Sequence, residues 1–150
     1  MTARRISAVV PTYREAERIG AVVERLVDEC TEVIVADGQS PDDTVPRAYD
    51  AGATVCVSPQ RGRGPQLNYG ARHARGEILV FVHADTTIPR GFGSAIVRAM
   101  AEPDVVGGNF ALRYAPPGLS ALLFTWPTGQ RRPHFSVYYG DSCIFVDRWR

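Results

Sequence analysis

The strongest constraint on the fold is the alternation of short apolar runs with segments of helical periodicity. Residues 33–36 read VIVA and residues 78–82 read ILVFV, so neither run contains a charged side chain. Strands that are apolar at successive residues are covered on both faces, as in parallel sheets. The clearest helical stripe consists of Ile19, Val22, Val23, Leu26 and Val27. This alternation predicts a mostly parallel α/β sheet with flanking helices and right-handed crossovers.

The other strands are predicted from shorter β-branched runs. They are expected at residues 6–10, 54–57, 105–112 and 144–146. The two glycines at 107–108 predict a break inside the third of these segments. Because the strand–helix repetition continues along the chain without a linker or an internal repeat, we expect a single domain over residues 1–150.

Capping residues predict where the first two helices begin. Thr12 and Glu15 have the spacing of a capping box, in which Glu15 reaches back to the amide of Thr12. The second helix is expected in the segment that follows Asp42 and reaches Asp50. Its start is placed late in that segment, because Pro46 is tolerated only in the first turn of a helix.

Two more helices are expected further along the chain. One covers residues 65–75 and has Gly76 as its cap, and its inward residues are Leu67, Ala71 and Ala74. The other follows Pro89, and its apolar residues are Phe92, Ile96, Ala99 and Met100.

Composition excludes several classes of protein. With 17 basic and 16 acidic residues the net charge is +1, which excludes nonspecific nucleic-acid binding driven by bulk charge. No apolar run approaches the roughly 20 residues that a membrane span requires. The first residues lack the apolar stretch of a signal peptide. Cys30, Cys56 and Cys143 form no C-x-x-C pair, so we expect reduced thiols in a cytoplasmic protein.

Unusual polar residues follow the predicted strands, and ligands of such sheets bind beyond the carboxyl ends of the strands. Asp37 directly follows an apolar strand. A carboxylate there either accepts hydrogen bonds from a ribose or a base, or braces its own loop. Arg61 and Arg63 flank Gly62, and their guanidinium groups suit phosphate oxygens, with a solvated loop as the alternative. The chain has no dinucleotide fingerprint and no Walker loop.

The strand at 78–82 is followed by two side chains of types that bind cations. His83 and Asp85 are alternate residues, so their side chains point the same way in an extended chain. Asp85 suits Mg²⁺ or Mn²⁺, and Mn²⁺ accepts an imidazole more readily. The alternatives are a histidine bonded to backbone and an aspartate that caps a turn. Asp141, before the last strand, is either a general base or a turn residue.

Four segments resemble inverting family 2 glycosyltransferases with the GT-A fold. Residues 9–16 (VVPTYREA) are similar to the opening of that family, and residues 35–44 (VADGQSPDDT) to its nucleotide-binding turn. Residues 62–71 (GRGPQLNYGA) and 81–86 (FVHADT) resemble a bacterial subgroup, the radical-SAM/selenodomain-associated or arsenosugar-biosynthesis transferases. The resemblance implies a GT-A-like sheet. Since the family normally continues with further helices, it also implies either a C-terminally truncated version of that fold or a minimal one.

The resemblance also implies roles for individual residues. Nucleotide-binding roles fall on Pro11, Thr12, Glu15, Asp37, Arg63 and Asn68. Arg61 joins this set by its chemistry. Asp85, with His83, would hold a divalent cation (Mg²⁺ or Mn²⁺), and Asp141 matches the catalytic base. The chain departs from the family pattern where His83 replaces an acid and where Gln39 replaces a glycine of the nucleotide-binding turn.

The predicted activity is the metal-assisted transfer of a sugar from a nucleotide-diphosphate sugar to an unknown acceptor hydroxyl, with inversion. One alternative is a nucleotidyltransferase, which would carry a glycine-rich, lysine-containing loop where residues 11–14 read PTYR. The other is a non-catalytic nucleotide-sugar-binding module. The apolar segment 119–126 is predicted to be core, with a homodimer face or a membrane-surface patch as alternatives. We therefore expect a cytoplasmic protein, peripheral at the inner membrane face if that patch is used, and no nucleic-acid partner.

Overall fold

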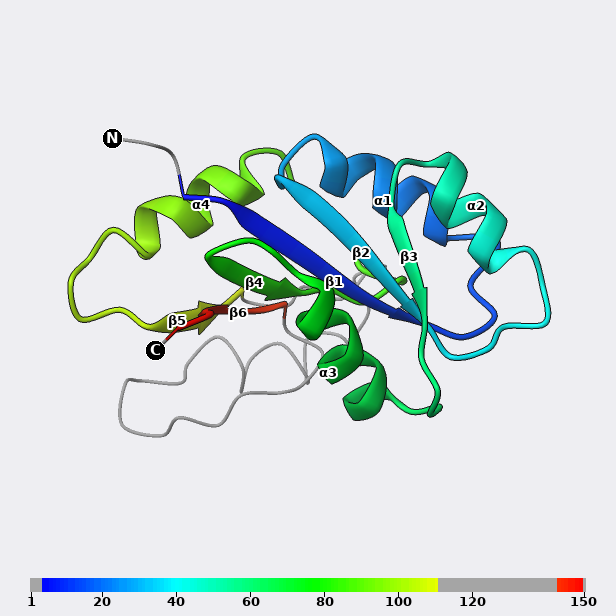
Figure 1. Ribbon diagram of the computed structural model, residues 1–150. Coiled ribbons are helices and arrows are strands. Elements are labelled where there is room, and N and C mark those ends of the chain that lie inside the picture. Colours follow the sequence, from blue (N-terminus) through cyan, green and yellow to red (C-terminus); the bar gives the residue numbers. More distant parts are fainter. Residues whose placement is uncertain (1–3, 111–142, 150) are drawn as a thin grey trace, which may run out of the picture.

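The computed structural model describes residues 4–110 and 143–149. These residues form a six-stranded sheet with the order β3-β2-β1-β4-β6-β5 (Figure 1). The strands are β1 (Ile6–Thr12), β2 (Glu32–Asp37), β3 (Thr54–Val57), β4 (Ile78–Phe81), β5 (Gly107–Asn109) and β6 (Ile144–Asp147). Strands β1 to β4 are parallel, whereas β6 pairs antiparallel with β4 and with β5. The prediction of a mostly parallel α/β sheet is confirmed.

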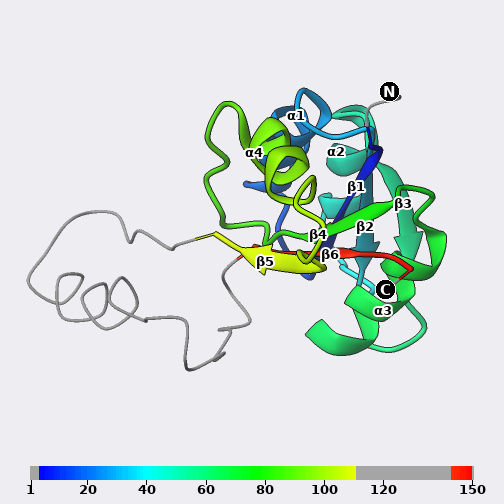
Figure 2. The same cartoon turned by 90° about the vertical axis from the view of Figure 1, so that its left-hand side faces the viewer.

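Helices cover both faces of the sheet. Figures 1 and 2 show α1 (Ile19–Val27), α2 (Thr44–Asp50) and α4 (Phe92–Ala99) on one face and α3 (Arg63–His73) on the other. Alternate strand residues point to opposite faces. Accordingly, Val10, Val35 and Val80 belong to the larger core, whereas Ile34 and Leu79 pack in a smaller cluster with residues of α3.

The α1 stripe is buried as predicted, apart from its last residue. Val27 is 45% exposed because it lies at the edge of the stripe, beside Gly52. The predicted capping box is wrong, since α1 begins at Ile19 and Thr12 ends β1 instead. The Thr12 hydroxyl is bonded to Asp37 of the neighbouring strand, so this side chain does not cap a helix.

Helix α3 begins two residues earlier than predicted. Of the three residues expected to point inward, Ala74 is buried and Ala71 packs with it in the smaller cluster, whereas Leu67 is half-buried. Gln66 and Gly70 are buried as well, which was not predicted. A Cβ atom on Gly70 would lie 2.5 Å from Cγ1 of Val9. The missing side chain therefore lets the helix approach the sheet closely.

Gly76 is not the cap of α3, which ends at His73. Its amide donates to Oγ of Ser7 at 2.7 Å, and a Cβ atom on Gly76 would lie 2.4 Å from that oxygen. The glycine is thus required by a close approach to β1 rather than by a helix end.

The predicted glycine break in the fifth strand is also wrong, because the two glycines are themselves in β5. Cβ atoms on Gly107 and Gly108 would lie 2.6 Å from the carbonyl oxygen and 2.7 Å from Cζ of Phe145, respectively. Glycine is therefore what allows β5 to pack against β6. Residues 111–112 of the predicted segment lie outside the described residues.

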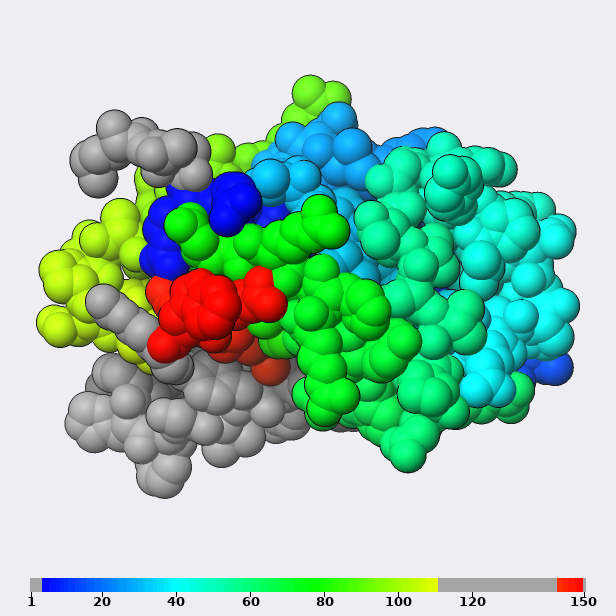
Figure 3. Space-filling view, in the orientation of Figure 1, coloured from blue at the N-terminus to red at the C-terminus, as the bar shows by residue number. Residues whose placement is uncertain are grey.

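Residues 143–149 return the chain to the sheet beside β4 and α3. In the space-filling view they lie against residues of the α3 and β4 region (Figure 3, red against green). The Arg148 guanidinium donates to the carbonyl oxygen of Ala74, and the Arg148 amide to that of Glu77 at 2.9 Å. Cys30, Cys56 and Cys143 are free thiols. Within the described part of the chain, no helix has the length and apolar character needed to span a membrane.

Candidate functional site

The carboxyl ends of β1 to β4 lie along one edge of the sheet, as their parallel pairing requires. Thr12 at the end of β1 stands opposite Asp37 at the end of β2, and Asp37 stands opposite Val57 at the end of β3. His83 and Asp85 follow the end of β4. The structure thus brings the segments singled out from residues 11–85 to a common edge.

The Asp37 carboxylate is buried at this edge, with 1% of the residue exposed. Oδ1 accepts hydrogen bonds from the hydroxyls of Thr12 (3.0 Å) and Ser40 (2.6 Å), and Oδ2 accepts one from the Ser40 amide (2.7 Å). Asp37 therefore braces the turn at residues 37–40, which is one of the two roles expected for it. A direct contact between Asp37 and a nucleotide stays a prediction.

Gln39 connects this turn to the loop after β3. Its backbone is in the left-handed region, with φ of 64°. Its side-chain amide donates to the carbonyl oxygens of Ser58 and Pro59, both at 3.3 Å. Gln39 stands where the resembled family has a glycine. Its two side-chain hydrogen bonds offset the cost of the left-handed backbone.

Arg61 reaches across the edge to Tyr13 in the loop after β1. Its guanidinium carbon lies 4.8 Å from the centroid of the Tyr13 ring, and Nη1 donates to the Tyr13 hydroxyl at 3.3 Å. The guanidinium carbon of Arg14 lies 5.5 Å from the same centroid. Tyr13 is 40% exposed, so an aromatic face and two cations lie at the rim. No role was predicted for Tyr13 from the sequence, although an aromatic residue directly after a strand was the available signal.

The other predicted nucleotide-binding residues lie at different depths. Pro11 and Glu15 are half-buried near the end of β1. Arg63 is exposed at the first turn of α3, at the edge itself. Asn68 is exposed on the same helix, but five residues correspond to a rotation of about 140°. The structure therefore brings Arg63 to the rim and leaves Asn68 on another side of the helix.

A cleft of about 350 Å³ lies between the β1–α1 and β2–α2 segments. Three basic and three acidic residues balance the charge of its lining, which is formed by Arg14, Glu15, Ala16, Glu17, Arg18, Asp42 and Arg47. Nη1 of Arg18 lies 3.4 Å from Oε2 of Glu15. Among the predicted nucleotide-binding residues, Glu15 lines this cleft.

Cys143, directly before β6, lies beside the predicted cation motif. It is buried, and its thiol shares a hydrogen bond with Thr86. Burial raises the pKa of the Cys143 thiol to about 11, and the nearby Asp85 carboxylate adds to the rise. Asp85 is therefore close enough to Cys143 to act on its thiol electrostatically. Asp141, two residues earlier, lies outside the described residues.

The two predicted cation ligands follow the end of β4. Asp85 is exposed and His83 half-buried. Within residues 4–110 and 143–149, no group of three His, Cys, Asp or Glu side chains could hold a metal ion. Mg²⁺ in phosphate-transfer sites commonly uses one or two carboxylates together with substrate phosphates. A cation bound by Asp85 and His83 stays a prediction.

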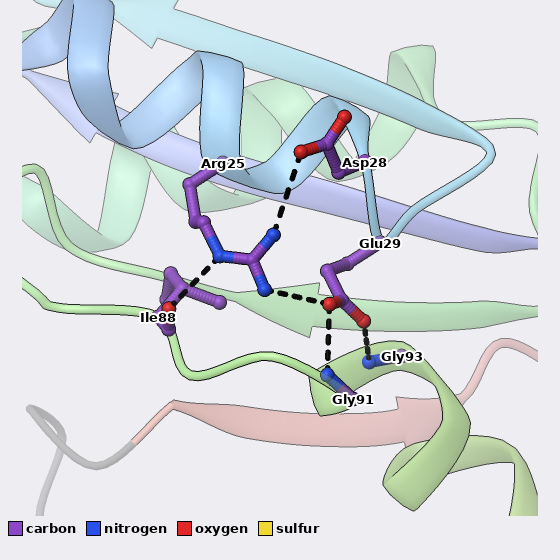
Figure 4. Close-up of polar contacts among 6 residues, drawn as sticks. All are labelled: Arg25, Asp28, Glu29, Ile88, Gly91 and Gly93. Atoms are coloured by element: carbon purple, nitrogen blue, oxygen red, sulfur yellow. Dashed lines mark hydrogen bonds and ion pairs between the residues drawn. The ribbon is translucent and has the colours of Figure 1, made fainter.

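The loop that follows β4 is anchored to α1 at its far end (Figure 4). Nε of Arg25 donates to the carbonyl oxygen of Ile88 at 3.2 Å, and Nη2 of Arg25 donates to Glu29 at 2.7 Å. The Glu29 carboxylate also accepts the amides of Gly91 (2.8 Å) and Gly93 (3.0 Å), at the start of α4. Residues 83–91 are thus held between β4 and this anchor.

The anchor depends on the charged form of Glu29. Burial disfavours the carboxylate, but the hydrogen bonds from Gly93, Gly91 and Arg25 outweigh that cost. Together they hold the pKa of Glu29 below its ordinary value of 4.5. A negative charge near a helix N-terminus is favourable as well, because the first backbone amides have no partner within the helix and point toward that charge.

Gln66 is a second residue that the sequence analysis missed. It is 4% exposed, and its side chain is bonded to the ends of β1 and β2 and to the loop before α3. Nothing in the spacing of a helix signals such a role, because the partners come from other parts of the chain.

A sheet of this order, covered by helices and carrying polar residues at its carboxyl edge, defines a GT-A glycosyltransferase fold. The chain belongs to glycosyl transferase family 2, whose model matches residues 7–146.

Two curated relatives are similar to parts of the chain. Glucosyl-3-phosphoglycerate synthase of Mycolicibacterium smegmatis is 38% identical over an alignment of 101 residues that covers 57% of this chain and 32% of that protein. Glycosyltransferase AglJ of Haloferax volcanii is 31% identical over an alignment of 110 residues that covers 71% of this chain and 36% of that protein. The chain thus spans about a third of the length of these relatives.

Solved structures match nearly the whole chain. A mycobacterial protein has a TM-score of 0.72 at 28% identity, over 97% of this chain and 54% of its own. Glucosyl-3-phosphoglycerate synthase from Mycobacterium tuberculosis, in complex with Mn²⁺, uridine diphosphate and phosphoglyceric acid, has a TM-score of 0.70 at 25% identity. That match covers 97% of this chain and 56% of the synthase.

Proposed function

We propose that this chain binds a nucleoside-diphosphate sugar at the carboxyl edge of its sheet and transfers the sugar, with inversion, to an acceptor hydroxyl. The observation that carries the proposal is that the carboxyl ends of β1 to β4 lie along one edge of the sheet in a chain of glycosyl transferase family 2. Thr12 and Arg61 lie at this edge, and Asp85, the candidate cation ligand, follows the end of β4. Asp141, the candidate base, stays a prediction, because it lies outside the described residues.

In this proposal the nucleoside lies over the ends of β1 and β2. Tyr13 offers a ring face for a base, and Thr12 and Asp37 form the floor beneath it. The diphosphate then lies toward α3 and β4, where the guanidinium groups of Arg61 and Arg63 attract its charge. Pro11, Glu15 and Asn68 stay predictions as further nucleotide contacts.

The proposed chemistry is a single displacement. The acceptor oxygen attacks the anomeric carbon while the bond from that carbon to the diphosphate breaks, and the diphosphate leaves with the bonding electrons. Asp141 takes the proton of the acceptor hydroxyl. A divalent cation held by Asp85, with His83 as a further candidate ligand, would neutralise charge on the departing diphosphate. Attack from the face opposite the leaving group inverts the configuration.

The relatives support a specific first choice of substrates. Because a related synthase is in complex with Mn²⁺, uridine diphosphate and phosphoglyceric acid, uridine-diphosphate glucose and 3-phosphoglycerate are the first donor and acceptor to try. Membership of the radical-SAM-associated subgroup stays a prediction. So do a cytoplasmic location, a homodimer and contact with a membrane surface, since segment 119–126 lies outside the described residues.

The test measures release of nucleoside diphosphate from uridine-, guanosine- and thymidine-diphosphate sugars, with and without Mn²⁺. Wild type should release nucleotide with one of these donors, and only with the cation. Asp85→Ala should remove the cation-dependent part, and Asp141→Asn should lower turnover at least a hundredfold, in the range of a lost general base. Asp104→Ala serves as the matched control, because Asp104 is exposed and follows α4.

The same assay separates the two alternatives. Tight donor binding without nucleotide release by wild type would favour a binding module. Release of pyrophosphate from a nucleoside triphosphate and a sugar phosphate would favour a nucleotidyltransferase. Unchanged turnover in Asp85→Ala would contradict the proposed role of Asp85.

A further inference from the structure

The side chain of Gln66 connects three segments at the carboxyl edge. Nε2 donates to the carbonyl oxygens of Thr12 (2.7 Å) and Ala36 (2.8 Å), near the ends of β1 and β2. Oε1 accepts the amide of Gly62 at 3.1 Å. A single side chain on α3 thus joins two strand ends to the turn that precedes its own helix.

This arrangement uses the full geometry of an amide group. A glutamine amide has two donor hydrogens and a carbonyl acceptor, and here both hydrogens and the acceptor are used. At 4% exposure the Gln66 side chain has little access to water, so losing a partner leaves its amide unsatisfied at a cost in stability. Gln66 is therefore rigidly held, unlike the exposed glutamine at position 60.

The bond to Gly62 acts on a turn with an unusual backbone conformation. Gly62 has φ of 118°, which side-chain-bearing residues rarely adopt. Its amide donates to Oε1 of Gln66, and its carbonyl oxygen accepts the Gln66 backbone amide at 3.0 Å. Arg63 comes next and is exposed at the first turn of α3. Both bonds to Gln66 therefore help to set the direction in which Arg63 leaves the backbone.

We infer that Gln66 is a positioning residue for the phosphate-binding turn, which it holds so that Arg63 meets the diphosphate of the bound nucleotide. The inference rests on the proposed function. Gln66 itself is buried behind the edge and acts through Gly62 and Arg63.

The first test needs no ligand. Amide hydrogen exchange of wild type should show the Gly62 amide protected at least tenfold over an unstructured glycine, although the amides at a helix start usually lack partners. In Gln66→Met, which keeps the length of the side chain and removes all three hydrogen bonds, this protection should disappear. Ile96→Val in α4 is the control for a general loss of stability, and it should leave Gly62 protected.

The second test measures binding by calorimetry with Mn²⁺, using uridine diphosphate or whichever of guanosine and thymidine diphosphate wild type binds more tightly. Gln66→Met should weaken binding of the diphosphate about tenfold and binding of the matching monophosphate less than threefold. In an Arg63→Ala background, Gln66→Met should cause no further loss, because the residue that it positions is gone.

Each result bears on a separate claim. A Gly62 amide that exchanges freely in wild type overturns the inference, as do additive losses in the double variant or equal losses for the diphosphate and the monophosphate. If wild type binds none of the nucleotides, the proposed function fails together with the assignment to a diphosphate. The exchange data then still decide whether Gln66 holds the turn.

Discussion

The Thr12 hydroxyl donates a 3.0 Å hydrogen bond to Oδ1 of Asp37 and thereby joins the ends of β1 and β2. Both residues are nearly inaccessible to solvent, at 2% and 1% exposure. A buried carboxylate is tolerated because donors surround it, and Ser40 supplies the others from its hydroxyl and its amide. The edge of the proposed nucleotide site is thus stiffened from within by the chain's own hydrogen bonds.

Thr12→Val should lower the free energy of unfolding by about 1–3 kcal/mol, because it preserves shape and leaves a buried carboxylate short of one donor. Urea denaturation measures the change. Thr54→Val is the matched control, since Thr54 is exposed in β3 and the substitution keeps a β-branched residue there. Equal stabilities for the two variants would show that the Thr12–Asp37 bond contributes nothing measurable.

Gly93→Ala should destabilise the protein by about 1–3 kcal/mol, because the new Cβ atom would lie 2.1 Å from the carbonyl oxygen of Glu29. Gly20→Ala in α1 provides the contrast. No atom lies within 4 Å of a Cβ atom at Gly20, and alanine in a helix is favoured over glycine by about 0.5–1 kcal/mol. The two thermal midpoints should therefore move in opposite directions. A stabilised Gly93→Ala would mean that the start of α4 does not pack against Glu29 in this way.

The sheet could be predicted from the sequence because its information is local. Runs such as residues 33–36 and 78–82 specify buried strands by themselves, and the α1 stripe specifies a covered face. The alternation of these elements is then enough to place the ends of β1 to β4 at a common edge. For the same reason, the prediction that these polar residues lie at the carboxyl ends of their strands is confirmed: Thr12 and Asp37 are the last residues of β1 and β2, and Asp85 follows β4.

What could not be predicted depends on partners far apart in the sequence. Gln66 is bonded to Thr12, 54 residues away, and Glu29 to Gly93, 64 residues away. From helical periodicity alone, Gln66 and Glu29 are both expected to be ordinary polar surface residues. The error at Thr12 has the same origin, since capping-box spacing is a local signal and a carboxylate on the next strand takes the hydroxyl instead.

Glu29→Gln should weaken the anchor of α4 in a pH-dependent way. Because the folded-state pKa of Glu29 is lowered from 4.5, its charge stabilises the fold fully above the unfolded-state pKa, and that stabilisation is lost as the pH falls through the folded-state pKa. Near neutral pH the variant should be less stable by about 1–2 kcal/mol. The difference between wild type and variant, from denaturation at several pH values, should shrink below pH 4.5. A difference that grows on acidification would contradict the assignment.

Gln39 offers a comparison between backbone strain and side-chain contacts. Gln39→Ala keeps a φ of 64° unfavourable and removes the bonds to Ser58 and Pro59, so it should destabilise the fold. Gln39→Gly removes the same bonds but also the strain, which is about 1–2 kcal/mol for a residue with a side chain. The glycine variant should therefore unfold at a higher urea concentration than the alanine variant. The reverse order would mean that residue 39 is not left-handed in solution.

Gly38 and Gln66 should be energetically coupled. A Cβ atom on Gly38 would lie 2.9 Å from Oε1 of Gln66, and Gln66 cannot move aside without breaking its buried hydrogen bonds. Gly38→Ala should thus destabilise wild type by about 1–3 kcal/mol. In a Gln66→Ala background the space is free, and the same substitution should cost less by at least about 1 kcal/mol. A double-mutant cycle by urea denaturation measures this coupling. Additive losses would show that the two side-chain positions do not meet, and the packing at the carboxyl edge would then have to differ from the one described.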